Sequence, residues 1–502
     1  MASPASAPVR KGTDRKFSLA LWMNRVLEEC DRASVEFAAD PVHDLRVALR
    51  RCRSIADGIM AIDPDPSWKR MKKAGKILFS SLGELRDTQV MEEWVHKLGA
   101  EDDPVTERLL QYLVHGECDL KMRAAQALHE FDRRQWKRWA SELPRRAARI
   151  RVGGLVFKHL ALERWTDAYA LHRSATRNRS QTAFHALRIG IKRFRYIVEN
   201  FLPEQHAAWS NDLKELQDLL GEVHDLDVLW ATALQISAFP NLESRSHWHT
   251  KIRDERTGRI EKYKRKMTGK NSLWFVWRNE LPVGKQIEDA ALSRLKLWGS
   301  VLDPDVQHAN HVARLALQIY DGLPSRQLGE AKTRQERAIL QAAALLHDVG
   351  RSQKGDAHHK ASYRLIREMK PPLGWNSEAM LIAGAAARYH HGAFPQARQK
   401  TLRGLNHEQR QTITRLAAIL RLANALDAEG DGRIRRVRLG AADGHFVVEA
   451  EGYSANDRLA EEIAAGRHLL ETVYRRPVLV KPLKAKQPAT ARDILRKPRI
   501  VR

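Results

Sequence analysis

Histidine and aspartate side chains recur in the C-terminal half of the sequence in a pattern that suits metal-assisted chemistry on phosphates. The central pair is His347-Asp348, within Leu-Leu-His-Asp-Val-Gly. Imidazole and carboxylate groups are the ligands that hold Mn, Fe, Zn or Mg ions at hydrolytic sites. An adjacent His and Asp at a helix terminus can bind one ion through the ring and bridge to a second through the carboxylate. The other members of the pattern are His308, His311, His358, His359, His390, His391 and Asp427.

Cations form a second pattern, which occurs twice in the N-terminal half. In each copy a histidine is followed by cations at positions i+3, i+7, i+8 and i+10. On an α-helix, positions i, i+3, i+7 and i+10 form one straight stripe. The first stripe is His43, Arg46, Arg50 and Arg53, the second is His185, Arg188, Lys192 and Arg195, and the cations at i+8 are Arg51 and Arg193.

Apolar residues predict the buried face of each of these helices. They are Val42, Leu45, Leu49, Cys52 and Ile55 in the first copy, and Phe184, Leu187, Ile191, Phe194 and Val198 in the second. Like charges at i,i+3 and i,i+4 repel by a few tenths of a kcal/mol per pair. A sequence that aligns them twice is therefore interpreted as preparing a site for a polyanion, with a solvated charged face as the alternative. Arg51 and Arg193 lie off the stripes and could instead pair with acidic neighbours.

The duplication extends into a second helix of each copy. The segment from Lys76 to Val90, with Leu-Gly-Glu-Leu-Arg-Asp at its centre, matches Lys214 to Val228, with Leu-Gly-Glu-Val-His-Asp. Internal duplication on this scale predicts two similar helical bundles related by a pseudo-twofold axis. Lys76, Arg86, Lys214 and His224 are expected to extend the polyanion site, and Asp87 and Asp225 to orient its cations or cap helices.

Over roughly residues 17–280 the duplicated pattern resembles the CHAD family, the conserved-histidine α-helical domain. The resemblance implies two four-helix bundles around a basic cavity, with repeats of about 17–165 and 180–280, and it implies that inorganic polyphosphate binds there. The implied polyphosphate-binding residues are His43, Arg46, Arg50, Arg51, Arg53, Lys76, Arg86, His185, Arg188, Lys192, Arg193, Arg195, Lys214 and His224.

The order His, His-Asp, Asp in the C-terminal half resembles the HD superfamily of metal-dependent phosphohydrolases. That resemblance implies a divalent cation, Mn, Mg, Fe or Zn, held by His308, His347, Asp348 and Asp427. It leaves His358, His359 and His391 for a second ion or a phosphate. His347, Asp348 and His390 are the expected catalytic residues.

A closer resemblance covers about residues 285–480. Leu-Leu-His-Asp-Val-Gly, His-His-Lys-Ala-Ser-Tyr and Ala-Arg-Tyr-His are similar to the C-terminal region of the exopolyphosphatase and guanosine pentaphosphatase family. That family hydrolyses phosphate with an N-terminal actin-like ATPase-fold domain, and nothing in this sequence resembles it. Exopolyphosphatase activity therefore does not carry over. A second departure is His391-Gly392, where the family usually has a basic residue after Tyr-His.

The expected fold is mainly α. Residues 1–14 are predicted to be disordered, 17–280 to form the CHAD domain, 285–430 an all-helical HD-like domain, and 431–480 a small α+β unit. In that unit Asp443-Gly444 lies between two strand-like segments and predicts a hairpin. Residues 481–502 form a basic tail.

Composition narrows the partners. The 502 residues carry a net charge of +25, which indicates an anionic partner such as nucleic acid, a membrane surface or a phosphate polymer. The sequence predicts no membrane span and no signal-peptide core. The three cysteines, Cys30, Cys52 and Cys118, lack metal-site spacing. Reduced thiols and a cytoplasmic location, including polyphosphate granules, are therefore expected.

Three functional hypotheses remain open at this point. The first is a polyphosphate-binding protein whose HD domain hydrolyses polyphosphate or guanosine phosphates with a divalent metal. The second is a non-enzymatic scaffold on polyphosphate granules with a vestigial HD domain. The third is a nucleic-acid-binding protein, in which Trp136 and Trp139, placed among cations, would stack on bases, although at this spacing we expect them to face the core.

Overall fold

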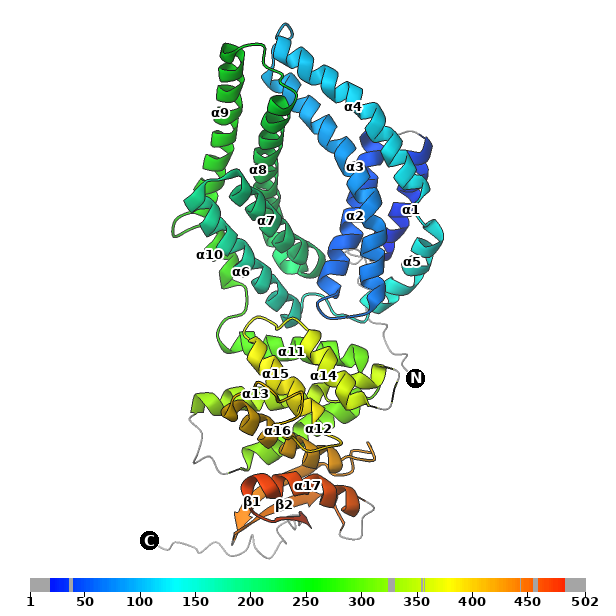
Figure 1. The fold of residues 1–502 in the computed structure, drawn as a ribbon, viewed down its shortest axis with the longest axis vertical. Helices are drawn as coiled ribbons and strands as arrows, with labels where there is room; N and C mark the ends of the chain where they lie inside the picture. The colour runs from blue at the N-terminus through cyan, green and yellow to red at the C-terminus, as the bar shows by residue number, and fades with distance from the viewer. Residues whose placement is uncertain are drawn as a thin grey trace, which may run out of the picture. The chain divides into compact units, whose positions relative to one another are not determined.

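The computed structural model describes residues 19–35, 39–323, 330–353, 355, 357–442, 444–454 and 459–483. The chain divides into two compact units, Met1–Ala290 and Ala291–Arg502 (Figure 1). The predicted disordered segment 1–14 lies outside the described residues, as do residues 484–502 of the predicted basic tail.

The first unit contains ten helices in its described part, arranged as two sets of five (Figure 1). The first set is α1 (Leu19–Val35), α2 (Ala39–Ile59), α3 (Pro66–Leu98), α4 (Pro104–His129) and α5 (Arg133–Ala147). The second set is α6 (Leu155–Asn178), α7 (Gln181–Phe201), α8 (Pro203–Gln235), α9 (Leu242–Met267) and α10 (Leu273–Asn279). Matched helices have equal lengths: α2 and α7 have 21 residues, α3 and α8 have 33, and α4 and α9 have 26.

Local sequence signals begin these helices. Asp65 and Asp103 cap α3 and α4 by accepting the backbone N–H groups of Ser67 and Val105, and each of these helices has proline in its first turn. Ser180 caps α7 in the same way. A capping oxygen satisfies a donor that the helix itself leaves unpaired, and proline there loses no hydrogen bond. The helix starts are therefore encoded locally.

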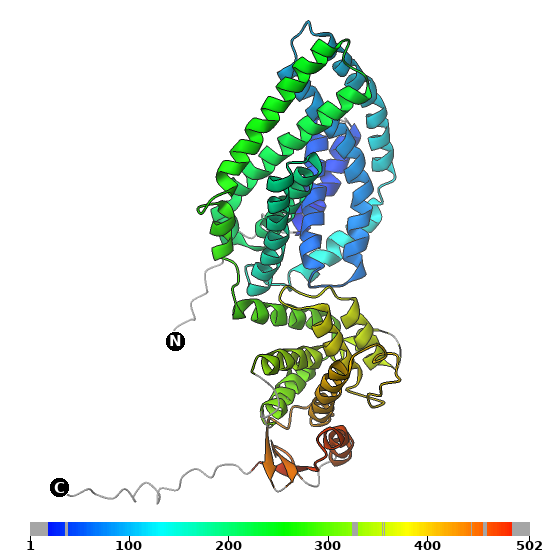
Figure 2. The same ribbon diagram turned by 60° about the vertical axis from the view of Figure 1, so that its left-hand side comes forward.

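The predicted apolar faces of α2 and α7 are buried. All ten residues are at most 4% exposed. Within each set α2 packs on α1 and α3, and α7 packs on α6 and α8, while across the sets α2 contacts α7 and α3 contacts α8. Figures 1 and 2 show these four helices facing one another between the outer helices α4 and α9. The prediction of a mainly helical fold is confirmed.

The two sets meet closely where α2 ends against α7. The Arg51 Nη2 atom lies 2.5 Å from Oε1 of the buried Glu199, and Asn200 donates a 3.0 Å hydrogen bond to Ser54. A Cβ atom at Gly58 would overlap the ring of Phe201. This glycine therefore permits the close approach of α2 to α7.

The second unit is helical with one small sheet. Its helices are α11 (Lys285–Leu302), which crosses the division between the units, α12 (Val306–Asp321), α13 (Glu330–Leu346), the short 3-10 helix η2 (Val349–Ser352), α14 (His358–Glu368), α15 (Ser377–Arg388), α16 (His407–Ala425) and α17 (Ala460–Tyr474). Fully buried alanines on α13, α15 and α16 let these helices approach closely. Among the described residues, no helix has the length and apolar character needed to cross a membrane.

The sheet of the second unit contains β1 (Arg436–Ala442), β2 (His445–Glu451) and β3 (Val478–Pro482). Strands β1 and β2 are antiparallel with Ala442 opposite His445, which confirms the hairpin. Strand β3 pairs with β2 in parallel. In the described part of the chain this is the only sheet.

We predict that Gly58→Ala lowers the stability of the first unit. Replacing a helical glycine by alanine normally stabilises by about 0.5–1 kcal/mol. Here the added methyl group meets the ring of Phe201, which is held by stacking on Phe157 at 4.3 Å between ring centroids. Overpacking of this kind costs about 1–3 kcal/mol. The midpoint of urea unfolding should fall.

Gly116→Ala is the matched control, because Gly116 lies within α4 and nothing surrounds its would-be Cβ within 4 Å. Its unfolding midpoint should rise or stay constant. Equal shifts in the two variants would contradict a steric role for Gly58.

Candidate functional site

The two cationic stripes face each other. Burial, with four neighbouring cations adding to it, lowers the pKa of Lys192 on α7 to about 8. The four cations are Arg188 on the same helix, and Arg50, Arg46 and Arg53 on α2. Because the interaction between two charges weakens with distance, cations that lower the pKa of Lys192 must lie close to it. These five side chains, Arg46, Arg50, Arg53, Arg188 and Lys192, are called the cation cluster below.

In the first repeat, residues of α3 closely surround the guanidinium group of Arg46. Its guanidinium lies 5.2 Å from the ring centroid of Phe79 on α3, and its Nη1 atom is 2.9 Å from the position of a Cβ on Gly83. That Nη1 is buried without a hydrogen-bond partner, and burial lowers the Arg46 pKa while Asp87 opposes the shift. A buried donor without an acceptor favours an anionic ligand.

The second repeat forms a pocket of about 280 Å³ between α7 and α8. Its lining residues are Arg188, Lys192, Gln217, Asp218, Gly221, Glu222 and Asp225. Close by, the Nδ1 atoms of His185 and His224 are 3.2 Å apart. Burial, with Arg188 adding to it, lowers the pKa of His224 to about 4. His224 is therefore neutral at pH 7, unlike its counterpart Arg86.

Two carboxylates lie within the cation cluster. Burial raises the pKa of Asp225 on α8 to about 6, with Arg188 opposing the shift and Asp87 on α3 adding to it. Burial also raises the pKa of Asp87, and Arg46, Arg188 and Lys192 oppose that shift. Both acids therefore interact with cations of both repeats.

The other predicted cations are spread around this cluster. Arg51 pairs with Glu199 and lies over the ring of Trp22, so its charge already has a carboxylate partner. Arg195 approaches the same carboxylate at 3.9 Å. Arg86 lies 3.3 Å from Glu93. The remaining predicted cations are exposed: His43, Lys76, Arg193 and Lys214.

In the second unit, His347 and Asp348 are buried where α13 meets η2. The Ser362 hydroxyl donates to the His347 carbonyl at 2.6 Å and accepts the Gly350 N–H at 2.9 Å. Gly350 has no room for a Cβ, because the His358 carbonyl and Ser362 fill that space. These contacts fix the turn that presents the His-Asp pair.

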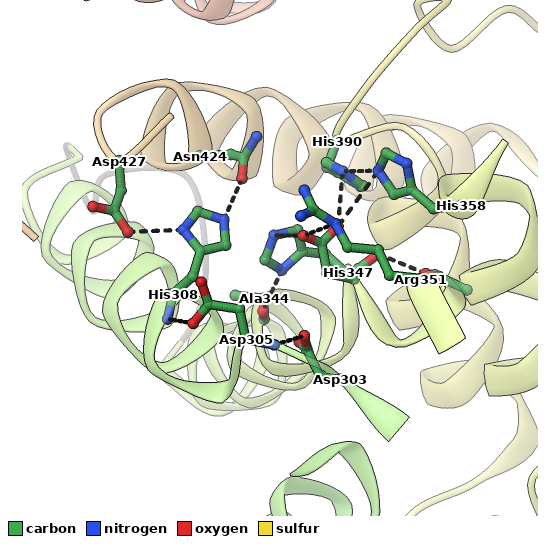
Figure 3. Close-up of polar contacts among 12 residues, drawn as sticks. Asp303, Asp305, His308, Ala344, His347, Arg351, His358, His390, Asn424 and Asp427 are labelled. Carbon is green, nitrogen blue, oxygen red and sulfur yellow. Dashed lines mark hydrogen bonds and ion pairs between the residues drawn. The ribbon is translucent and has the colours of Figure 1, made fainter. Parts of the chain in front are cut away.

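Backbone carbonyls set the tautomers of two buried histidines. His347 Nδ1 lies 2.7 Å from the Ala344 carbonyl (Figure 3). His390 Nδ1 lies 2.7 Å from the Ala387 carbonyl. Each Nδ1 therefore carries the proton, which leaves Nε2 as a lone-pair donor. Burial lowers the pKa of both rings. Both are neutral, as metal ligands must be.

Three acceptor atoms converge at this centre. Asp348 Oδ1 lies 3.4 Å from His358 Nε2 and 3.6 Å from His390 Nε2, and the two nitrogens are 3.3 Å apart. Ligand atoms about 2.1 Å from a tetrahedral ion are about 3.4 Å from one another. Asp348 Oδ1 is also buried without a hydrogen-bond partner. The residues present therefore fit a divalent cation.

His308, His347 and Asp348 form a second group that could hold an ion. The His308 ring, however, faces oxygens on both sides, with Asp427 Oδ2 2.8 Å from Nδ1 and Asn424 Oδ1 3.1 Å from Nε2 (Figure 3). Although burial alone would lower it, the hydrogen bond to Asp427 raises the pKa of His308. His308 must therefore lose a proton before it can bind a metal ion. Asp427 lies beside the His308 ring, and among the described residues it belongs to neither of the two groups that could hold an ion.

His359 and His391 lie at the edge of the centre. Their rings are 5.8 Å apart, and each lies within 5.8 Å of the His358 ring. Burial, with Arg388 adding to it, lowers the pKa of His359 to about 4, whereas His391 is exposed. Neither belongs to a potential ligand group among the described residues.

Sequence reasoning missed two charged residues of this centre. Arg351 Nε lies 2.7 Å from Asp348 Oδ2. Asp303 is buried, its Oδ2 has no hydrogen-bond partner, and burial raises its pKa, with His347 opposing that shift and Asp348 adding to it. One feature of the sequence could have indicated Asp303: it lies two residues before Asp305, the N-cap of α12. The Asp305 side chain accepts the backbone N–H of His308 at 2.9 Å.

The comparisons with known proteins agree with the predicted resemblances. Residues 24–234 match the family model of the CHAD domain, and residues 292–460 match that of the Ppx/GppA phosphatase, domain III. The chain therefore joins a CHAD domain to a domain III of the Ppx/GppA phosphatases. No curated protein matches the chain.

We predict that His390→Ala lowers the affinity of the second unit for Mn²⁺ or Zn²⁺ by about 10-fold or more, because it removes one of three converging ligands. The readout is the bound metal after dialysis, together with the rise in unfolding temperature on adding metal. His468→Ala is the control, since His468 is 63% exposed. Equal metal content in both variants would rule out the proposed ligand set.

Proposed function

We propose that the CHAD domain binds inorganic polyphosphate at the cation cluster. The observation that carries this proposal is the approach of Arg46, Arg50 and Arg53 on α2 to Lys192 on α7, where these cations add to the burial that lowers the Lys192 pKa to about 8. Such a cluster is repulsive when empty, and a chain of regularly spaced phosphates relieves the repulsion along its length. Both matched domain types also suggest a function related to polyphosphate.

Arginine and lysine have different parts in this binding. Arg46, Arg50, Arg53 and Arg188 offer planar guanidinium groups that bind phosphate oxygens bidentately, whereas Lys192 acts as a point charge. Phe79 lies under both Arg46 and Arg53, at 5.2 and 4.8 Å, and orients them. Binding releases counterions from the polymer, so the affinity must fall as salt rises.

The test measures polyphosphate affinity by titration of the full chain. We predict that Arg46→Gln with Arg188→Gln weakens binding by about 10- to 100-fold, because charge-assisted hydrogen bonds contribute about 1.5–3 kcal/mol each before solvent screening. The dependence on salt should also become shallower. Arg245→Gln with Arg253→Gln is the control, because it removes two exposed charges of α9. A similar loss in the control would show that binding follows net charge alone.

Nucleic-acid binding has less support. Trp136 and Trp139 are 0% and 7% exposed and pack in the core, so they offer no stacking surface for bases. Competition decides between the polymers. Displacement of polyphosphate by duplex DNA at equal phosphate concentration would favour the nucleic-acid hypothesis.

A second proposal concerns the Ppx/GppA domain III, which we infer to be a metal-dependent phosphohydrolase acting on polyphosphate or guanosine phosphates. Asp348, His358 and His390 would hold the ion, with His347 beside them. A divalent ion at this position supplies Lewis acidity and lowers the pKa of water towards neutrality. Asp303 would accept a proton, since its Oδ2 is buried and unpaired. Arg351, which is paired with Asp348, would bind a substrate phosphate in place of that carboxylate.

Phosphate release from polyphosphate, or from guanosine tetra- and pentaphosphate, tests this proposal in the presence of Mn²⁺. We predict that Asp348→Asn lowers the rate by at least about 100-fold, since a ligand carboxylate is lost. Asp321→Asn, an exposed residue paired with Arg337, should retain the rate. If no release occurs, or if Asp348→Asn is as active as the wild type, the scaffold hypothesis replaces this proposal.

A further inference from the structure

One of the matched positions at which the two CHAD repeats differ changes the space above a matched glycine. Phe79 on α3 corresponds to Gln217 on α8, three residues after the matched lysines Lys76 and Lys214. In the first repeat, Arg46 and Arg53 lie over the Phe79 ring. The Arg46 guanidinium also covers Gly83, at 2.9 Å from its would-be Cβ. The space above this glycine is therefore filled by the protein itself.

In the second repeat the corresponding space is open. Among the described residues, a Cβ built on Gly221 would meet nothing within 4 Å, and the 280 Å³ pocket lies there. Gln217 Oε1 is buried in this region, and no described residue forms a hydrogen bond with it. Arg188 and Lys192 line the pocket, so it combines two cations with an unsatisfied buried amide.

The pocket also contains acids, which restricts the phosphate group it suits. The lining acids are Asp218, Glu222 and Asp225. Asp218 is exposed and Glu222 is paired with Arg259, whereas burial raises the pKa of Asp225 to about 6, with Arg188 opposing the shift. An internal phosphate of the polymer has two non-bridging oxygens that share one negative charge, and it has no proton that titrates near neutral pH. A terminal phosphate has three non-bridging oxygens and a second acidic proton with a pKa of about 6, as in a phosphomonoester. Two acids of similar pKa in one site share a proton.

We propose that the second CHAD repeat is a chain-end subsite: the terminal phosphate of polyphosphate enters the pocket over Gly221, Arg188 and Lys192 neutralise its charge, and Asp225 shares its proton. The first repeat has no such subsite, since Phe79 and Arg46 fill the matched space, and it contacts internal phosphates. This inference rests on the polyphosphate binding proposed above, and it states which repeat holds an end of the bound chain.

The experiment compares linear polyphosphate of one defined length with the same chain methylated at both terminal phosphates. Capping removes the terminal proton and leaves the internal phosphates unchanged. Dissociation constants for the full-length protein are measured by calorimetric titration at constant pH and salt. The ratio of the capped to the uncapped constant is called the end ratio. The wild type should give an end ratio of about 10, which corresponds to about 1.4 kcal/mol.

Gln217→Phe gives the second repeat the residue that the first repeat already accommodates, and it should lower the end ratio to about 1 while the capped chain still binds. Asp225→Asn removes the proton-sharing acid and should lower the end ratio as well. Gln235→Phe makes the same exchange at an exposed position of α8 and should leave the end ratio at the wild-type value. Circular dichroism of each variant checks that the fold is retained.

An end ratio of 1 in the wild type, or one unchanged by Gln217→Phe, overturns the chain-end subsite while leaving polyphosphate binding intact. Failure of the wild type to bind either chain overturns polyphosphate binding itself. The two proposals therefore fail in different ways.

Discussion

One constraint underlies the structure of both domains: groups of like charge, or of like hydrogen-bonding character, are held close together at partly buried sites. In the CHAD domain, cations from α2 and α7 are brought together around Lys192, where they add to the burial that lowers its pKa to about 8. Repulsion of this kind opposes folding. It is tolerated because the apolar faces of the same helices are buried, and burial of that surface outweighs the repulsion. The site is therefore arranged for an anion before any anion binds.

The Ppx/GppA domain III instead brings together atoms with lone pairs, which favour a cation. His347, His390 and Asp348 present lone pairs to a centre that His358 also approaches, and Arg351 contacts the aspartate. Backbone carbonyls of Ala344 and Ala387 fix the tautomers that create this surplus of acceptors. A divalent cation would satisfy it, as a polyphosphate chain would satisfy the surplus of donors in the CHAD domain. The two domains thus favour ligands of opposite charge.

Duplication explains why one CHAD repeat can differ from the other. Equal helix lengths preserve the frame, so that an exchange of Phe79 for Gln217 changes only the local packing above a matched glycine. One repeat uses an aromatic ring to hold its arginines, and the other leaves a pocket. In the proposed chain-end subsite, a single helix position would convert a contact along the polymer into a contact at its end.

The sequence by itself determined the helical class, the buried faces of α2 and α7 and the internal duplication, because a helix of 3.6 residues per turn fixes which side chains share a face. Its motifs indicated both domain types through their resemblance to known families. It also indicated His347 and Asp348 as neighbours. It could not assign Arg51 to Glu199, predict the hydrogen bond between His308 and Asp427, or find Asp303 and Gln217. Those relations join residues on different helices, and their distances depend on how the helices pack. Periodicity acts along one helix, whereas contacts between helices are decided only by the tertiary structure.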